Sequence, residues 1–163
     1  MTDNTRRVVV TGLGIVSPVG SSIDKAWGNI KNGVSGIRKI SSFDASSFSV
    51  QISGSVTDFN ADDYITPKDQ KKMDTFIHYG IGASVMAIKD SGIEITDDNR
   101  DRIGVSIGSG IGGLPYIERN YGKFLEKGPR KISPYFVPSS IINMVSGNLS
   151  IMYGITGPNM SLV

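Results

Sequence analysis

The clearest evidence for the fold is the segment Arg102-Ile-Gly-Val-Ser-Ile-Gly-Ser-Gly-Ile-Gly-Gly113. Its first half, residues 102–107, is a short apolar run rich in β-branched side chains, which predicts a buried strand. Its second half is a run of glycines, and the sequence predicts a helix directly after it, over about residues 114–126. A strand that leads through a glycine loop into a helix is typical of an α/β fold with a parallel sheet.

The same alternation extends to both sides of this unit. Residues 74–91 are apolar almost all round, which predicts a closely packed, buried helix that ends at Gly92. In a second, shorter helix we expect Trp27 and Ile30 to face the core. The other predicted elements are strands at residues 7–11, 50–56 and from 159, and helices at 24–32, from 66–67 onward and at 138–153. This order predicts one layered α/β domain over residues 1–163, with a mostly parallel sheet.

Composition and charge exclude several classes of function. Apolar residues make up 39% of the 163 and charged residues 20%, as in an ordinary globular domain. The net charge of +2 is too small to indicate nucleic-acid binding. With no cysteine and a single histidine, His78, the sequence predicts no disulfide, no metal site and no thiol nucleophile within these residues. Without a bilayer-spanning apolar stretch or a signal peptide, we expect a cytoplasmic protein.

The glycine loop allows three interpretations. Gly108-Ser-Gly-Ile-Gly-Gly113 fits the G-x-G-x-x-G pattern, in which backbone amides at a helix start bind the phosphates of a dinucleotide. However, a whole strand and helix precede it, and no acidic residue closes a second strand about twenty residues later. The second interpretation is a tight turn packed under a helix, and the third is a loop whose glycines let a long substrate pass.

Five basic residues form two clusters. Lys68, Lys71 and Lys72 have the i, i+3, i+4 spacing that puts side chains on one face of a helix. Arg130 and Lys131 form a pair in a loop between two predicted helices. Such clusters are usually a solvated surface. The alternative is a docking site for an acidic partner, because positive charge speeds and orients association.

Several segments together resemble the N-terminal half of the β-ketoacyl-[acyl-carrier-protein] synthases, in particular the type II elongating condensing enzymes of bacterial fatty-acid synthesis. In order along the whole chain they are Arg7-Val-Val-Val-Thr-Gly-Leu-Gly14, Ser17-Pro-Val-Gly20, Lys72-Met-Asp-Thr-Phe-Ile77, Arg102-Ile-Gly104, the glycine loop, Gly128-Pro-Arg-Lys-Ile-Ser-Pro134 and Tyr153-Gly-Ile-Thr-Gly-Pro158. No single segment is decisive, but the set is very specific.

The resemblance implies a fold, an assembly and a reaction. The fold is the thiolase-like α-β-α-β-α sandwich of two related halves, of which this chain supplies the first. The assembly is a homodimer whose central sheet continues across the two-fold axis through the strand at about Asn159. In the reaction, a cysteine thiolate takes an acyl chain from acyl carrier protein. Malonyl-carrier protein then loses carbon dioxide and lengthens the chain by two carbons, with no cofactor and no metal.

The resemblance puts the catalytic groups outside these residues. The nucleophilic cysteine is expected about three residues past Val163, and the two histidines and the lysine of the active site are expected in the second half. The apolar run that ends at Val163 then reads as a strand leading toward the nucleophile. The 163 residues alone are expected to be inactive.

The resemblance leaves this chain two roles. Ile111, next to Gly110, is expected at the acyl-chain channel. The glycines of the loop are then expected to leave room for an alkyl chain. Phe136 and Val137 are expected to line the pocket of the partner protomer. The residues expected to meet the acidic acyl carrier protein are Lys68, Lys71, Lys72, Arg130 and Lys131.

Three classes of function follow in order of preference. The first is the condensing enzyme. The second is a non-catalytic ketosynthase-like partner subunit, which keeps the fold and the dimer interface but lacks the nucleophile. The residue at the expected nucleophile position separates these two, since only the enzyme needs cysteine there. The third class, a dinucleotide-binding domain, is tested by thermal shift with NAD or NADP.

Overall fold

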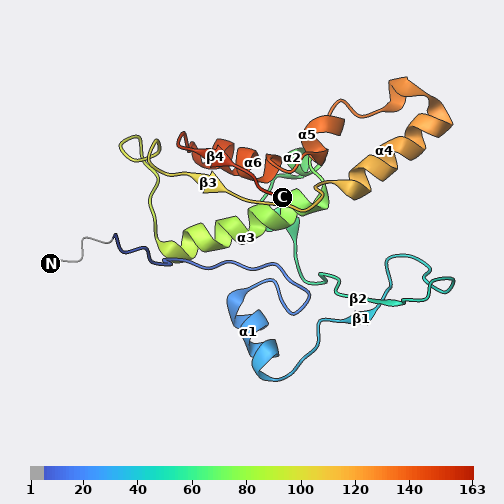
Figure 1. Ribbon diagram of the computed structural model, residues 1–163, viewed down its shortest axis with the longest axis horizontal. Helices are drawn as coiled ribbons and strands as arrows, with labels where there is room; N and C mark the ends of the chain where they lie inside the picture. Colours follow the sequence, from blue (N-terminus) through green and yellow to red (C-terminus); the bar gives the residue numbers. More distant parts are fainter. Residues whose placement is uncertain (1–5) are drawn as a thin grey trace.

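The computed structural model describes residues 6–163. The protein is organised around one long helix, α3 (Thr75–Ser91) (Figure 1). The Asp74 side chain caps the start of α3, and Gly92 ends the helix in the left-handed conformation. Ile77 and Ile81 have no exposed surface. The predicted buried helix is therefore confirmed, including its end at Gly92.

The core forms where α3 crosses α6 (Met144–Tyr153). Gly80 of α3 lies so close to Val145 of α6 that a Cβ atom at position 80 would collide with the valine side chain. The glycine thus lets two helix backbones approach each other, as in tightly packed helix pairs. The buried apolar residues of this core are Ile65, Ile77, Ile81, Val85, Val105, Val145, Leu149 and Ile155.

Two strands far apart in the sequence form a parallel pair beside this core. β3 (Val105–Ser106) pairs with β4 (Asn159–Met160). Hydrogen bonds continue beyond the strand ends, from Ile107 N–H to Met160 O at 3.3 Å and from Ser109 N–H to Leu162 O at 3.1 Å. The predicted strands at residues 102–107 and from 159 are therefore confirmed as parallel neighbours, although the regular strand is shorter than predicted.

The second sheet is antiparallel and small. β1 (Arg38–Lys39) pairs with β2 (Ile52–Ser53), and both lie below α3 in Figure 1, next to α1 (Ile23–Lys31). The strand predicted at residues 50–56 is confirmed at its centre. Because only one of the two described strand pairs is parallel, the prediction of a mostly parallel sheet is wrong for the described residues.

The strand predicted at residues 7–11 is also wrong. No strand is formed there in the described chain. Val8, Val9 and Val10 are exposed, and the chain contacts α3 from Gly12 onward (Figure 1). Gly12 and Gly14 press their backbones against carbonyl groups of α3, where a Cβ atom would not fit. No strand of the described chain lies beside residues 7–11 to form a ladder of hydrogen bonds with them, so their β-branched side chains do not make a strand here.

Two predicted helices differ from the structure in detail. α1 forms as predicted, but Trp27 and Ile30 are exposed, and Ala26 is its one buried residue. The predicted helix at residues 138–153 is divided into α5 (Phe136–Ser140) and α6. The break occurs because Ile141 has an extended backbone, with ψ at 142°.

The remaining helical elements are η1 (Ala61–Asp63), α2 (Pro67–Gln70), α4 (Leu114–Lys127) and η2 (Pro129–Lys131). α2 begins at Pro67 with Thr66 as its cap, and α4 begins at Leu114, both as predicted. α4 projects from the body of the molecule and ends at η2 (Figure 1). Within residues 6–163, no helix has the length and apolar character needed to cross a membrane.

Candidate functional site

The glycine loop lies where the carboxyl ends of the two parallel strands meet. It follows β3 and precedes α4, and its second residue, Ser109, donates its N–H to Leu162 O at 3.1 Å. The loop is therefore directly beside the chain that leaves β4. In α/β proteins this edge of a parallel sheet is where ligands bind.

Most glycines of the loop are required by neighbouring backbone. A Cβ atom at Gly108 would lie 2.6 Å from Leu162 O, and one at Gly113 would lie 2.6 Å from Ser139 O. Gly112 has a φ of 82°, a conformation that side chains disfavour, and it abuts the backbone of α5. Gly110 alone of these faces open space. The loop is thus a tight turn packed against α5, and clearance for a ligand exists at Gly110.

The start of α4 has no backbone donors left for a phosphate. The N–H of Gly113 donates to Ser140 O at 2.9 Å, and the N–H of Leu114 donates to Gly112 O at 3.0 Å. Residue 115 is proline, and Tyr116 N–H donates to Asp74 Oδ2 at 2.8 Å. A carboxylate of the protein itself thus accepts an N–H group that a phosphate at this helix start would need. This geometry argues against the dinucleotide-binding interpretation.

Ile111 is the most prominent side chain of the loop. It is 69% exposed, next to Gly110 at the tip between Ser109 and Gly112. Ser109 Oγ accepts a hydrogen bond from Gly112 N–H at 3.1 Å, which closes the tip into a compact turn. The structure therefore presents an apolar side chain on a rigid base, at the open edge of the parallel strands.

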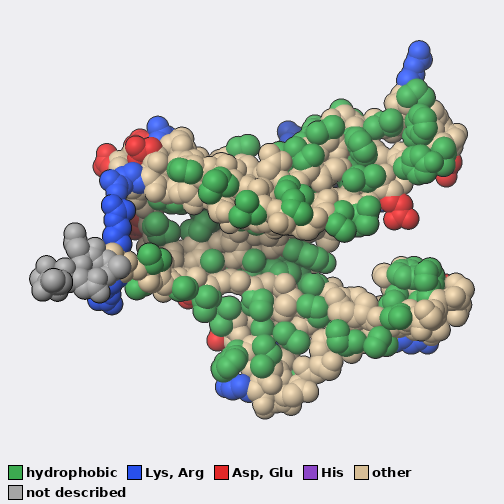
Figure 2. Space-filling model, viewed as in Figure 1, with side chains coloured by type: hydrophobic (Ala, Val, Ile, Leu, Met, Phe, Trp, Pro, Cys, Tyr) green, Lys and Arg blue, Asp and Glu red, His purple; other side chains and the backbone are tan. Residues whose placement is uncertain are grey.

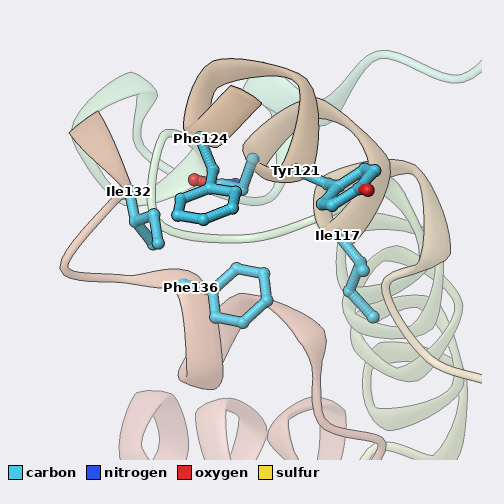
Figure 3. A pocket seen from close by; sticks show the side chains of 6 residues that line it. Ile117, Tyr121, Phe124, Ile132 and Phe136 are labelled. Atoms are coloured by element: carbon cyan, nitrogen blue, oxygen red, sulfur yellow. The ribbon is translucent and has the colours of Figure 1, made fainter. Parts of the chain in front are cut away.

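Phe136 lies at the start of α5 and lines an apolar cavity of about 280 Å³ between α4 and α5 (Figure 3). The other side chains around this cavity are Ile117, Asn120, Tyr121, Phe124 and Ile132. Val137, its neighbour in the sequence, is exposed and lies outside that lining. The two residues predicted to act together therefore face different surroundings in this chain.

A closed set of hydrogen bonds holds the segment before α5 against α4. The buried Asn120 side chain donates to Tyr116 O at 2.9 Å and accepts from Ser133 N–H, also at 2.9 Å. Tyr116 Oη donates to Ser133 Oγ at 2.8 Å. This set fixes the chain between η2 and α5, and so the entrance of the apolar cavity.

The predicted basic residues occupy two separate elements. Lys68 lies on α2 and Lys71 at its end, both exposed, while Arg130 and Lys131 are exposed on η2 beyond α4. Among residues 6–163, no hydrogen bond or ion pair joins one cluster to the other. The third lysine, Lys72, lies past the end of α2 and is half-buried. The prediction that one helix face carries all three lysines is therefore wrong, because α2 ends at Gln70.

Lys72, which follows the end of α2, is already paired with Asp69 of that helix. Its Nζ lies 2.6 Å from Asp69 Oδ1, and this hydrogen-bonded carboxylate raises the pKa of Lys72 above its usual value. The same bond, together with one from Thr66 Oγ1 at 2.8 Å, lowers the pKa of Asp69. Lys72 O also accepts a hydrogen bond from Ser139 Oγ at 2.5 Å, which ties the end of α2 to α5.

Asp74 is 1% exposed and has two roles, of which only one has a local signal in the sequence. Its Oδ1 accepts from Thr75 N–H at 2.7 Å and lies 3.5 Å from Arg119 Nη2, while Oδ2 accepts from Tyr116 N–H. One carboxylate thus caps two helices, α3 and α4. An aspartate before an apolar helical run signals the first cap. The second contact spans 42 positions and has no local signal.

Comparisons with known proteins cover almost the whole chain. Residues 5–163 match the family described as "Beta-ketoacyl synthase, N-terminal domain". The chain is 55% identical over 157 residues to 3-oxoacyl-[acyl-carrier-protein] synthase 2 of Vibrio harveyi and 52% identical to that of Vibrio cholerae. It is 44% identical over 158 residues to that of Staphylococcus aureus. The alignments cover 96 to 97% of this chain but only 38% of each relative.

Solved ketosynthases share the fold. The ishigamide ketosynthase/chain length factor matches 97% of this chain and 40% of its own, with a TM-score of 0.82 and 26% identity. A type II polyketide ketosynthase in complex with its acyl-carrier protein matches 93% of this chain and 40% of its own, with a TM-score of 0.76 and 27% identity. The thiolase-like fold expected from the sequence is therefore confirmed.

Proposed function

Because this chain belongs to the β-ketoacyl synthase family as its N-terminal domain, we propose that the protein containing it is a 3-oxoacyl-[acyl-carrier-protein] synthase. Such an enzyme condenses an acyl thioester with malonyl-acyl carrier protein and lengthens a fatty acid by two carbons. The proposal extends beyond this chain, which spans 38% of the length of the curated relatives it matches.

The proposed reaction has two half-reactions. A cysteine thiolate attacks the thioester of acyl-carrier protein, the acyl group moves to the cysteine sulfur, and the carrier thiol leaves. Malonyl-carrier protein then loses carbon dioxide, and the carbon left with the electron pair attacks the acyl-enzyme thioester. The cysteine thiolate leaves, and a 3-oxoacyl-carrier protein is released. Hydrogen-bond donors stabilise the oxyanions that develop in these steps.

The observation that carries the proposal is the hydrogen bond from Ser109 to Leu162. The nucleophile is expected about three residues past Val163, at the end of the strand that includes β4. The bond brings the glycine loop alongside that strand, with Ile111 exposed at the tip. We assign Ile111 and Gly110 to the wall of the acyl-chain channel, where the open space at Gly110 gives the alkyl chain room.

Phe136 and Val137 are proposed to act across a dimer. Val137 is exposed and Phe136 borders an apolar cavity, so both are available to a second protomer. Apolar side chains cover much of the surface in Figure 2, on both sides of the hollow between the α4–α6 part and the α1–β2 part. Exposed apolar area on this scale favours burial against further protein, here the second half of the enzyme and a second protomer.

Acyl carrier protein is the proposed partner of the basic clusters. One ketosynthase of this fold was solved in complex with an acyl-carrier protein. The exposed cations of α2 and η2 offer the charge that would attract an acidic carrier. We propose that the docking residues are Lys68, Lys71, Lys72, Arg130 and Lys131. We further propose that the enzyme acts in the cytoplasm, on soluble carrier-bound substrates.

The test uses the full-length protein with acyl-carrier protein and malonyl-carrier protein. Intact mass spectrometry of the carrier is expected to show a 3-oxoacyl chain two carbons longer, and a reaction without malonyl-carrier protein is the control. Acyl transfer to the enzyme without extension, or no reaction at all, would contradict the proposal. The second outcome would favour the alternative of a non-catalytic partner subunit.

A further inference from the structure

The loop that carries Ile111 is held at three points. Near its β3 end, Ser109 N–H is bonded to Leu162 O. Near its α4 end, Gly113 N–H donates to Ser140 O of α5 at 2.9 Å. The third point is the first turn of α4, where Tyr116 N–H donates to the buried carboxylate of Asp74. Ile111 is mostly exposed, so its position depends on these anchors and not on packing of its own side chain.

Asp74 is the anchor with the most contacts. Each of its two oxygens serves a different helix, Oδ1 the start of α3 and Oδ2 the start of α4. A Cβ atom at Gly113 would lie 3.0 Å from Oδ2, so the loop backbone also rests directly on this carboxylate. The negative charge is favourable at two helix N-termini at once, and Arg119 lies beside it.

We propose that Asp74 is a positioning residue that determines how sharply the enzyme discriminates between acyl chain lengths. It does so by fixing the first turn of α4, and with it the loop that presents Ile111 to the acyl chain. This inference rests on the proposed function. Asp74 contacts no reacting atom, and it affects chain-length discrimination only by fixing the position of the loop. A residue of this kind matters because small displacements of a binding wall change selectivity strongly.

Two substitutions separate the two duties of Asp74. Asp74→Ser and Asp74→Asn both retain a side chain that is favoured as a helix cap, so the start of α3 is preserved. Serine cannot serve both helices with its single short hydroxyl, and asparagine has only one acceptor oxygen. Because Thr75 is the next residue in the chain and Tyr116 is 42 positions away, we expect the remaining acceptor to keep the cap of α3, and the first turn of α4 to lose its partner. The matched control is Asp97→Asn, which removes an exposed carboxylate paired with Arg100.

The readout is kcat/KM of the full-length enzyme for a series of acyl-carrier proteins from short to long. In both Asp74 variants, the ratio between the best and the worst accepted chain length is expected to fall about tenfold, while the value for a short primer stays within about twofold. The control keeps the wild-type profile. Hydrogen exchange of residues 108–116 is expected to become faster in the same variants.

Three results would overturn the inference. One is a uniform loss of kcat/KM at every chain length, which indicates a purely structural role. The second is a chain-length profile identical to wild type. The third is failure of both variants to yield folded protein. If the wild-type enzyme itself makes no 3-oxoacyl product, the proposed function fails instead, so the two failures are distinguishable.

Discussion

Lys72 and Asp69 form an ion pair at the end of α2, with Lys72 Nζ 2.6 Å from Asp69 Oδ1. The three lysines of this cluster therefore differ in how much free charge they present. The positive charge of Lys72 is balanced by the Asp69 carboxylate, whereas Lys68 and Lys71 are exposed and form no ion pair among residues 6–163. On charge alone, these two lysines should contribute most to the attraction of an acidic carrier protein.

Reversing the charge of Lys68 and Lys71 tests this directly. The double variant Lys68→Glu, Lys71→Glu of the full-length enzyme is expected to raise KM for acyl-carrier protein about tenfold at low salt, since like charges then oppose docking. The effect should shrink as salt is added. The control is Lys31→Glu, Lys39→Glu, which makes the same change in net charge on α1 and β1. Equal effects of the two double variants would refute a specific dock on α2.

Ile111→Phe is expected to shorten the longest acyl chain that the full-length enzyme accepts. The larger side chain narrows the channel beside Gly110, while short primers do not reach it. Chain-length profiles of kcat/KM measure the change, and we expect a loss of about tenfold or more for the longest substrates only. Ile52→Phe on the exposed strand β2 is the matched control. A profile that matches wild type would remove Ile111 from the channel.

Gly80→Ala tests the contact between α3 and α6. The added methyl group meets the Val145 side chain, and such overpacking costs about 1–3 kcal/mol of unfolding free energy. Thermal unfolding of the full-length protein should therefore begin at a lower temperature. Gly122→Ala in α4, where a Cβ atom meets open space, should instead stabilise by up to about 1 kcal/mol. Destabilisation by both changes, or by neither, would contradict the packing described.

The contact between Lys25 and Asp58 predicts a pH dependence. Lys25 Nζ lies 2.6 Å from Asp58 Oδ2, and this bond, with one from Ser21 Oγ at 2.8 Å, lowers the pKa of Asp58 from 3.8 to about 2. Because the pKa of Asp58 is lower in the folded protein than in the unfolded chain, its carboxylate stabilises the fold at pH values above the unfolded pKa of 3.8. That stability is lost as the pH falls toward about 2.

Asp58→Asn should accordingly lower the melting temperature of the full-length protein at pH 7. The difference in melting temperature from wild type should persist to about pH 4 and narrow below it. At lower pH the Asp58 carboxylate of the wild type becomes protonated and stabilises the fold less. Melting curves at a series of pH values measure this. A difference that stays constant down to about pH 3 would show that Asp58 does not act through its charge.

Local signals in the sequence predicted several helix boundaries well. Thr66 before Pro67 marked the start of α2, and Gly92 marked the end of α3. These features depend on backbone groups within one turn of the signal, so neighbouring residues are sufficient to specify them. The glycine loop was also identified between the correct strand and helix, because its residues are contiguous.

Features set by distant partners could not be predicted from local pattern. The β-branched run at residues 7–11 has strand propensity, but no strand of the described chain pairs with it, so no ladder forms. Trp27 and Ile30 have the spacing of a buried face, yet no described element covers them. The bond between Asp74 and Tyr116 likewise links two helix starts that only the folded chain brings together.

The central claim is that an acyl chain bound to the enzyme passes the loop that carries Ile111. The most direct measurement is photo-crosslinking of the full-length enzyme loaded with an acyl chain that bears a diazirine, followed by peptide mapping. We expect labels on residues 110–111, with further labels on Phe136 or Val137. An enzyme that becomes acylated but is labelled only outside these residues would contradict it.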